Sequence, residues 1–264
     1  MVSLKDININ CEIIEPKIIK FIQNNINNAH LRGAVVAASS GIDSAVTLHL
    51  TVKAIGAENV TVITMPERDI TPERDIMDVM LHCEQLNLTC NTVDITSILH
   101  VMQQNLPNYD HKDRIASGNI RSRMRMIIAY HYANKEHKMV MGTSNKTELL
   151  TGFFTKYGDG GVDLMPLADL YKHNIRQLAK YLKIPQNIID KTPSPGFYVG
   201  QTDEAELGCD YNTVDLIIHL WEKGHINSEI SDKLNIPIQT VNSIIYRIKA
   251  NEHKRRLPLI LRLS

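Results

Sequence analysis

Small hydroxyl residues, a glycine and a carboxylate stand together in the segment S-S-G-I-D-S at residues 39–44. The segment follows a short apolar run and precedes a helical pattern, so it is expected to form the turn between a buried strand and a helix. Backbone N–H groups at the start of a helix attract phosphate oxygens. A carboxylate there opposes an anion unless a cation bridges the two, so Asp43 points to Mg²⁺ shared with phosphate. The G-x-x-x-x-G-K-[ST] pattern of a Walker A loop is not present.

A second carboxylate follows another apolar run, at residues 138–142. Thr143 and Ser144 end this run, and Glu148 lies in the first turn of the helix expected next. Because the carboxyl ends of parallel strands meet at one edge of a sheet, Asp43 and Glu148 are expected to face the same phosphate chain. Two carboxylates combined with phosphate oxygens are typical of a Mg²⁺ site.

Both turns also have a purely structural interpretation. Ser40 with Asp43, and Asn145 with Glu148, have the spacing of helix N-caps, in which a side chain satisfies a backbone N–H group. Charged residues in the Gly-rich stretch at 157–163 are typical of a solvated loop. From the residues alone, the structural and the functional interpretation both stay open.

The apolar pattern predicts an alternation of strands and helices around the two turns. Strands are expected over 34–38, 60–65, 89–93 and 138–142, and the main helices over 12–30, 42–55, 72–87, 118–134 and 171–182. This order predicts an α/β fold, a doubly wound, Rossmann-like parallel sheet with helices on both faces, because a parallel crossover needs a helix to return the chain. The last fifty or so residues show helical patterns and no strand pattern.

Composition excludes several classes of protein. The 264 residues carry 29 Lys+Arg against 29 Asp+Glu, and a formal net charge of zero argues against a dedicated nucleic-acid or membrane-surface protein. The four cysteines form no C-x-x-C pair and no cluster with zinc spacing. No stretch approaches the roughly 20 apolar residues that span a bilayer. A reduced, cytoplasmic, soluble protein is therefore expected.

Motifs along nearly the whole chain resemble those of the ammonia-dependent NAD⁺ synthetases. The first turn resembles the S-G-G-x-D-S loop of ATP-pyrophosphatases, with Ser40 where glycine is usual. Residues 142–172 resemble, in order, the motifs G-T-[SD]-x-x-x-E, F-F-T-K-Y-G-D-G-G-x-D and P-L-x-x-L-x-K. Residues 118–126 resemble G-N-x-x-A-R-x-R-M with Ser122 in place of alanine, residues 201–208 contain T-D-E-x-E-L-G, and residues 252–255 read E-H-K-R.

The resemblance implies a single synthetase domain over residues 1–264, with an α/β core of ATP-pyrophosphatase type over about 1–208 and a helical extension over about 209–264. It also implies a reaction. ATP adenylates the nicotinate carboxylate of deamido-NAD⁺ and releases pyrophosphate, and ammonia then displaces AMP to give NAD⁺. A carboxylate becomes a good electrophile only when its oxygen leaves as part of AMP. The implied partners are ATP, deamido-NAD⁺ and ammonia, the implied cofactor is Mg²⁺, and a homodimer is expected.

The resemblance further assigns roles to individual positions. ATP would be held by Ser39, Ser40, Gly41, Ile42, Asp43, Ser44, Thr143, Lys172 and Ser194. Mg²⁺ would be bound by Asp43 and Glu148. Deamido-NAD⁺ would be bound by Arg123, Lys156, Asp163, His253 and Lys254. No residue is expected to act as a covalent nucleophile, so catalysis would come from positioning and electrostatics.

Glutamine-dependent members resemble this domain joined to an N-terminal amidohydrolase domain. The phosphate-loop motif of this chain already begins at residue 39, so free ammonia is the expected nitrogen source. One alternative is another ATP-pyrophosphatase ligase that acts on a different carboxylate or on a nucleobase. A second alternative is a DNA-binding protein, because residues 226–249 resemble a helix-turn-helix followed by a basic tail. The same residues are also compatible with two helices packed against the core.

Overall fold

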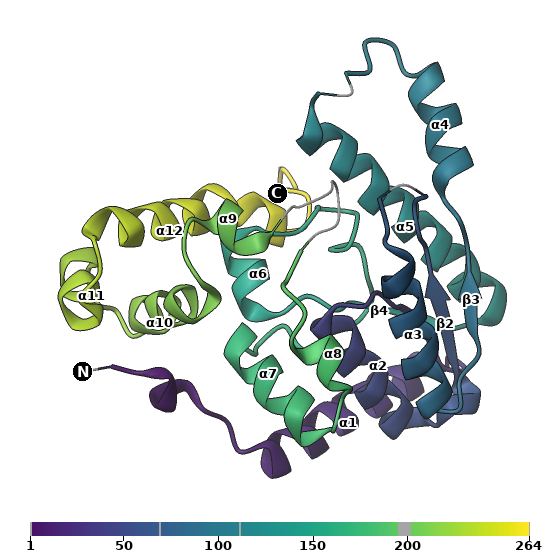
Figure 1. The fold of residues 1–264 in the computed structure, drawn as a ribbon, viewed down its shortest axis with the longest axis horizontal. Helices are drawn as coiled ribbons and strands as arrows, with labels where there is room; N and C mark the ends of the chain where they lie inside the picture. Colours follow the sequence, from purple (N-terminus) through teal and green to yellow (C-terminus); the bar gives the residue numbers. More distant parts are fainter. Residues whose placement is uncertain (1, 69, 111, 195–201, 264) are drawn as a thin grey trace.

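The computed structural model describes residues 2–68, 70–110, 112–194 and 202–263. Within these residues the strands form one four-stranded sheet (Figure 1), in the order β3-β2-β1-β4. Its strands are β1 (Ala34–Ala37), β2 (Val60–Thr64), β3 (Cys90–Thr92) and β4 (Met139–Met141). Every neighbouring pair is parallel, which confirms the predicted sheet. The strand order reverses at β1, between β2 and β4, and ligands of such sheets bind at this kind of switch point.

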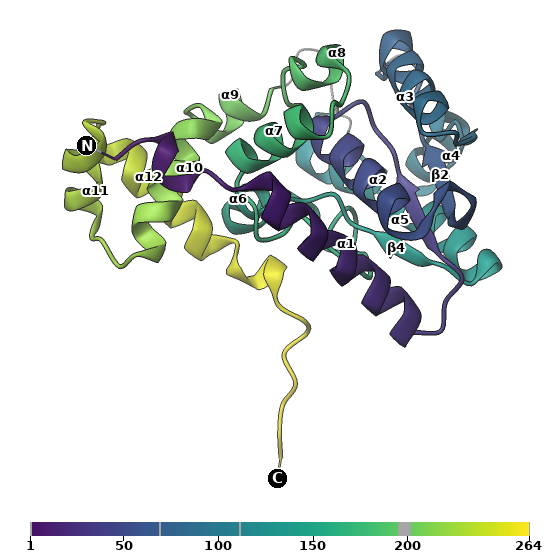
Figure 2. The same ribbon diagram turned by 90° about the horizontal axis from the view of Figure 1, so that it is seen from below.

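Helices cover both faces of the sheet (Figure 2), as predicted. One face carries α1 (Cys11–Asn28), α2 (Ile42–Ile55), α3 (Glu73–Gln85) and α7 (Lys172–Tyr181), and the other carries α4 (Thr96–Asn105) and α5 (Arg114–Glu136). The side chains of β1 show how one strand contacts both groups of helices, because successive side chains of a strand point to opposite faces of the sheet. Ala34 and Val36 pack with the first group of helices, whereas Val35 packs with the second.

The long helix α5 begins earlier than its predicted start at residue 118. Asp113 acts as N-cap, because its carboxylate accepts a hydrogen bond from the backbone N–H of Ala116 at 2.9 Å. The helix ends at Glu136, where His137 adopts a left-handed conformation with φ of 57°. Strand β3 is shorter than the strand predicted over 89–93.

The remaining helices gather beside the sheet. They are α6 (Lys146–Thr151), α8 (Gln186–Ile189), α9 (Asp203–Leu207), α10 (Tyr211–Glu222), α11 (Asn227–Leu234) and α12 (Ile238–Ala250). The last three form a core of their own, joined by Tyr171 and by Ile7 from the N-terminal 3-10 helix Leu4–Ile7. The N-terminal segment therefore packs against the C-terminal helices (Figure 2). The division of the chain near residue 208 stays a prediction.

The helix-turn-helix pattern forms α11 and α12. Asn235 ends α11 in a left-handed conformation, and the apolar residues between the helices are buried, namely Ile230, Val241, Ile244 and Ile245. These side chains contribute to the C-terminal core, as the packed-helix interpretation expects.

None of the helices in the described residues combines the length and the apolar composition that a membrane span needs.

Replacing Gly152 by alanine is expected to destabilise the fold. Gly152 ends α6 with φ of 72°, and a Cβ there would lie 2.2 Å from Cβ of Asn251, whose side chain donates a hydrogen bond to the Thr151 carbonyl. Backbone strain of roughly 1–2 kcal/mol and overpacking of roughly 1–3 kcal/mol both lower the free energy of unfolding, measured in urea. Gly224→Ala is the matched control, because Gly224 has φ of 85° and an added Cβ there would have no atom within 4 Å. Equal losses in both variants would contradict the Asn251 contact.

Candidate active site

The turn after β1 is closed by its own hydroxyl groups. Ser44 Oγ donates to the carbonyl of Ser39 at 2.6 Å, and the Gly41 N–H donates to Ser39 Oγ at 3.2 Å. Gly41 is the N-cap of α2 and supplies no side-chain cap, so the predicted cap by Ser40 is wrong. The first N–H groups of a helix without such a cap suit an anion. The geometry of the turn is therefore compatible with the anion site predicted after the first strand, which stays a prediction.

Ser40 fits the position at which the family motif has glycine. Ser40 is not among the non-glycine residues of positive φ in the described part of the chain, so the added Cβ causes no backbone strain. The side chain is buried, and its Oγ accepts a hydrogen bond from the ammonium of Lys191. The departure from the motif is thus tolerated by the backbone and adds a contact with a distant lysine.

Lys172 lies between the two carboxylates that the sequence predicted to share one edge of the sheet. Its Nζ is 2.5 Å from Asp43 Oδ2 and 3.2 Å from Glu148 Oε1. The lysine side chain is only 2% exposed. Asp43 comes from the start of α2 and Glu148 from α6, so the ends of β1 and β4 meet here. The structure therefore brings these three predicted residues together at the switch point of the sheet.

Burial and charge act in opposite directions on this group. Burial, followed by the nearby Asp43 carboxylate, raises the pKa of Glu148 to about 8. Burial disfavours the charge of Lys172, but Asp43 and Glu148 outweigh it and raise the pKa of the lysine. Lys172 therefore stays charged at neutral pH, whereas Glu148 is ready to give up a proton when a further cation arrives.

Asn145 serves both as a helix cap and as a partner of Asp43. Its Oδ1 accepts from the Glu148 N–H at 3.0 Å, and its Nδ2 donates to Asp43 Oδ1 at 2.8 Å. Asn145 is fully buried. The predicted capping pair Asn145–Glu148 is confirmed, and the same side chain also orients the Asp43 carboxylate. The structural interpretation of this turn is therefore confirmed, and its functional interpretation stays a prediction.

Replacing Asn145 by aspartate is expected to keep the cap and impair the site. Aspartate caps helices as well as asparagine does, but it has no N–H for Asp43 and adds a second negative charge beside it. Loss of such a supporting contact typically costs roughly 10–100-fold in metal affinity or activity. The variant is compared with Asn145→Ser, which keeps a capping oxygen without the added charge, by measuring the KM for Mg²⁺–ATP and the thermal midpoint. Equal activity in the two variants would contradict the role of charge.

The donor set at this edge suits Mg²⁺ bound together with a nucleotide. Asp43 and Glu148 offer carboxylate oxygens, which Mg²⁺ prefers. In the described ranges no group of three or more His, Cys, Asp and Glu residues could hold a metal ion by itself. Mg²⁺ commonly takes one or two carboxylates and completes its shell with phosphate oxygens and water. The two carboxylates therefore fit an ion that binds with ATP.

The other two residues assigned to ATP lie on the segments beyond β4 and α8. Thr143 is separated from β4 by Gly142 and is half-buried. Ser194 is exposed and is the last described residue before the gap at 195–201. Gln201, the first residue of the T-D-E motif segment, and Pro195 lie outside the described residues.

Four of the five residues assigned to deamido-NAD⁺ lie in one neighbourhood. The guanidinium of Arg123 donates to the carbonyl of Lys156, and Lys156 Nζ donates to the carbonyl of His253 at 2.7 Å. Lys254 Nζ donates to the carbonyl of Gly152 at 2.7 Å. The cluster joins α5, the Gly-rich loop and the segment after α12, three parts of the chain that are distant in sequence.

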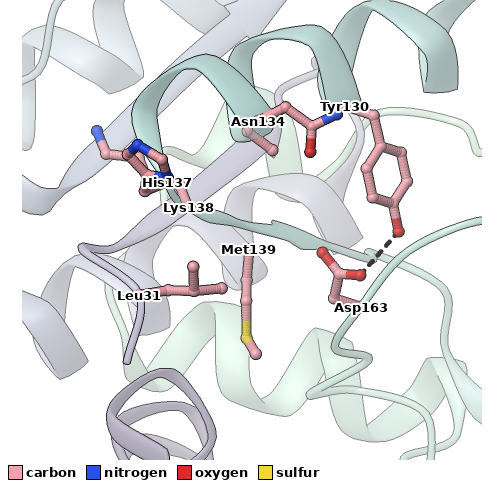
Figure 3. A pocket seen from close by; sticks show the side chains of 8 residues that line it. Leu31, Tyr130, Asn134, His137, Lys138, Met139 and Asp163 are labelled. Atoms are coloured by element: carbon pink, nitrogen blue, oxygen red, sulfur yellow. Dashed lines mark hydrogen bonds between the residues drawn. The ribbon is translucent and has the colours of Figure 1, made fainter. Parts of the chain in front are cut away.

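The fifth residue, Asp163, has different neighbours. It accepts hydrogen bonds from the hydroxyl of Tyr130 at 2.9 Å and from the N–H of Val140 at 2.8 Å. Figure 3 shows Tyr130 pointing at this carboxylate. Asp163 lines a cavity of about 310 Å³ together with residues of α5 and of β4, among them Asn134 and Met139. The cavity lies at the lower end of the range typical of small-ligand sites.

Two buried residues beside Lys172 were assigned no role from the sequence. The Tyr211 hydroxyl donates to Asp203 Oδ2 at 2.6 Å, and Lys172 Nζ lies 4.9 Å from the centre of the Tyr211 ring. Burial raises the pKa of Asp203. Asp203 belongs to the T-D-E-x-E-L-G motif, which was the signal that could have found it.

The Gly-rich loop carries a carboxylate, Asp159, that is exposed as the sequence predicts for this loop but also accepts hydrogen bonds from within the chain. Asp159 Oδ1 accepts from Ser122 Oγ at 2.7 Å and from the N–H of Thr155 at 2.9 Å. Loss of surrounding water raises the pKa of the Asp159 carboxyl. Ser122 is the serine that replaces the alanine of the family motif, so this second departure also makes a side-chain contact.

The sequence and fold were compared with known proteins. The family model for NAD synthase matches residues 14–258. The chain is 43% identical to the NH(3)-dependent NAD(+) synthetase of Methanosarcina acetivorans over 247 residues, which is 94% of this chain and 96% of that protein. It is also 43% identical to the enzyme of that name from Methanocaldococcus jannaschii over 249 residues, 94% of this chain and 95% of that protein.

Solved structures agree with these sequence relatives. NMN synthetase from Francisella tularensis has a TM-score of 0.83 at 30% identity and covers 96% of this chain and 99% of its own. NH3-dependent NAD synthetase from Campylobacter jejuni, solved with nitrate, has a TM-score of 0.80 at 30% identity, with 96% and 100% covered. These relatives do not favour the DNA-binding alternative. With its parallel sheet and its matching sequence over nearly the whole length, the chain belongs to the NAD synthase family.

Proposed function

We propose that this chain forms NAD⁺ by ATP-dependent amidation of deamido-NAD⁺ with ammonia. The observation that carries the proposal is Lys172 held between Asp43 and Glu148, next to the start of α2. This arrangement provides helix N–H groups and an ammonium for phosphate oxygens, and two carboxylates for a metal. It suits a ligase that splits ATP between its α and β phosphates. The names of the sequence relatives support NAD⁺ as the product and ammonia as the nitrogen donor.

The reaction needs charge neutralisation more than it needs a nucleophilic side chain. The N–H groups of α2 and the Lys172 ammonium bind the phosphates, so that an oxygen of the nicotinate carboxylate can attack the α-phosphorus and pyrophosphate can leave. Ammonia then attacks the activated carbonyl carbon, and AMP leaves with the carboxylate oxygen. Asp43 and Glu148 would hold Mg²⁺, which supplies positive charge for the phosphates of ATP. Thr143 and Ser194 are proposed as further contacts to ATP.

The dinucleotide is proposed to bind the cluster formed by Arg123, Lys156, His253 and Lys254. Three of these side chains are cationic at neutral pH and suit a substrate that carries a diphosphate and a carboxylate. Asp163 is proposed to contact a different part of the dinucleotide, because it lines the separate cavity shown in Figure 3. Its carboxylate is an acceptor and suits hydroxyl groups better than phosphate.

We also propose that the chain forms a homodimer through α4 and α5. These helices carry exposed apolar side chains, including Val101 on α4 and Ile115 and Ile127 on α5. Apolar side chains gathered at one surface are typical of an interface. Sedimentation is expected to give the mass of a dimer, and replacing Ile115 and Ile127 by glutamate is expected to give a monomer. A wild-type monomer at micromolar concentration would contradict the proposal.

The activity is tested by supplying deamido-NAD⁺ and Mg²⁺–ATP with either ammonium or glutamine. NAD⁺ is expected to appear with ammonium, in step with pyrophosphate. Turnover with glutamine comparable to that with ammonium would overturn the proposed nitrogen source. The nicotinate mononucleotide is the informative second substrate, because one similar structure is called an NMN synthetase. A higher kcat/KM with the mononucleotide would assign this chain to the other reaction.

A further inference from the structure

We propose that Lys191 is a second lysine for the phosphates of ATP, held ready for pyrophosphate by Ser40 and Asp75. The inference rests on the proposed function. Lys191 follows α8, and its ammonium donates a hydrogen bond to Ser40 Oγ in the phosphate turn. The same ammonium is 2.5 Å from Asp75 Oδ1 on α3. Three segments distant in sequence thus place one cation at the turn.

The position of Ser40 makes this contact informative. Ser40 lies within the phosphate turn, immediately before Gly41, the N-cap of α2. A group that reaches Ser40 Oγ therefore lies beside the N–H groups expected to receive phosphate oxygens. Ser40 is also where the chain departs from the glycine of the family motif. Glycine has no hydroxyl, so in this chain the serine supplies an anchor for Lys191 that the usual residue lacks.

The charges of the site indicate that the departing pyrophosphate needs a cation besides Lys172. Lys172 already pairs with the Asp43 carboxylate at 2.5 Å, so its charge is largely offset before ATP arrives. Pyrophosphate leaves with several negative charges, and cations that stabilise this developing charge lower the barrier. Lys191 approaches the turn from the α3 side, through Asp75, and Lys172 approaches it through Asp43. Together the two lysines would contact the phosphate chain from different segments.

The ion pair with Asp75 positions Lys191 but leaves its ammonium able to exchange partners. The lysine side chain is 30% exposed and that of Asp75 is 24% exposed, so water reaches the pair. Ion pairs accessible to water are weak and exchange partners readily. Lysine has a flexible four-carbon stem, so its ammonium can move from Asp75 to a phosphate oxygen without a change in the backbone. Asp75 would then act as a positioning residue, and Lys191 as a binding residue.

A purely structural role for Lys191 makes a different prediction. If the lysine only tied α3 to the segment after α8, removing either partner of the ion pair would have the same effect. Lys191→Met and Asp75→Asn would then lower the thermal midpoint by similar amounts and would change phosphate binding equally or not at all. If Lys191 binds pyrophosphate, Lys191→Met weakens binding, whereas Asp75→Asn frees the ammonium and does not.

The experiment measures binding of Mg²⁺–pyrophosphate to the full chain by calorimetry, together with product inhibition. Loss of one charge-assisted hydrogen bond is expected to raise the Kd roughly 10–100-fold in Lys191→Met, with a parallel rise in the KM for ATP and little change in the KM for deamido-NAD⁺. Lys191→Arg is expected to restore binding to within about threefold, since it keeps the charge. Asp75→Asn is expected to bind at least as tightly as the wild type. Lys180→Gln, on the exposed end of α7, is the matched control and should bind like the wild type.

An unchanged Kd for pyrophosphate in Lys191→Met would overturn the inference, whatever happens to the thermal midpoint. Weaker binding in Asp75→Asn equal to that in Lys191→Met would also overturn it, because the pair would then act only as a brace. Failure of the proposed function is separable: a wild-type chain that forms no NAD⁺ but binds pyrophosphate through Lys191 would refute the function and leave the inference standing. A wild-type chain that forms NAD⁺, together with an unchanged Kd for pyrophosphate in Lys191→Met, would support the function and refute the inference.

Discussion

Replacing Lys172 by methionine is expected to lower kcat/KM by roughly 100–1,000-fold, the usual loss when a preorganised donor to developing charge is removed. Methionine fills a similar volume without the ammonium. Asp43 and Glu148 then face each other without the cation between them, and Glu148 takes up a proton more readily. The phosphates lose a direct partner at the same time. Both effects act on ATP, so the KM for ATP should rise along with the fall in kcat.

Lys146→Met is the matched control for this prediction. Lys146 also lies at the start of a helix and also pairs with two carboxylates, Asp169 at 2.8 Å and Glu222 at 3.4 Å. Neither carboxylate belongs to the proposed ATP site, so activity is expected to stay near that of the wild type. Steady-state kinetics of both variants make the comparison. A Lys172→Met enzyme within about threefold of the wild type would refute the account of the site.

Glu148→Gln is expected to cause a comparable loss of activity and to change the pH dependence of ATP binding. The raised pKa of Glu148, about 8, means that the free protein holds a proton here at neutral pH. Mg²⁺ needs the ionised carboxylate, so binding of Mg²⁺–ATP should release this proton. Affinity should therefore rise with pH by up to about tenfold per unit below pH 8 and level off above it. The glutamine variant has no proton to release.

The same pKa has a consequence for folding. Between the ordinary pKa of a glutamate and about 8, the folded chain binds a proton that the unfolded chain has lost. The contribution of Glu148 to the stability of the free protein therefore falls as the pH rises through this window.

The proton release on binding is measured separately. Calorimetry of Mg²⁺–ATP binding in buffers of different ionisation enthalpy counts the protons released. Equal proton release by the wild type and by Glu148→Gln would contradict the assignment.

Much of the fold could be predicted because apolar periodicity reports burial. The run at 34–38 was expected as a buried strand, and Val35 and Val36 do pack into opposite layers. The start of α5 was missed by four residues because the cap by Asp113 precedes the apolar pattern. The packing of Ile7 against the C-terminal helices could not be predicted, because contacts between the two ends of a chain leave no local signal.

The residues of the candidate site could be predicted from the sequence where they belong to recognisable motifs. Asp43, Glu148 and Lys172 were named from the sequence and lie within one hydrogen-bonded group. Asn145 was expected only as a cap, because its bond to Asp43 joins positions far apart in the chain. The contacts of Ser40 and Ser122 were missed for the same reason. Each departs from the motif by adding a hydroxyl, and only the fold shows which distant group that hydroxyl meets.

The central claim is that the nicotinate carboxylate is adenylated at the site formed by Asp43, Glu148 and Lys172. The most direct measurement supplies deamido-NAD⁺ whose nicotinate carboxylate carries the heavy isotope of oxygen, and follows the isotope into the products by mass spectrometry. The account predicts one heavy oxygen in AMP, none in pyrophosphate and one left in the amide of NAD⁺. Heavy oxygen in pyrophosphate or orthophosphate, with AMP unlabelled, would contradict it.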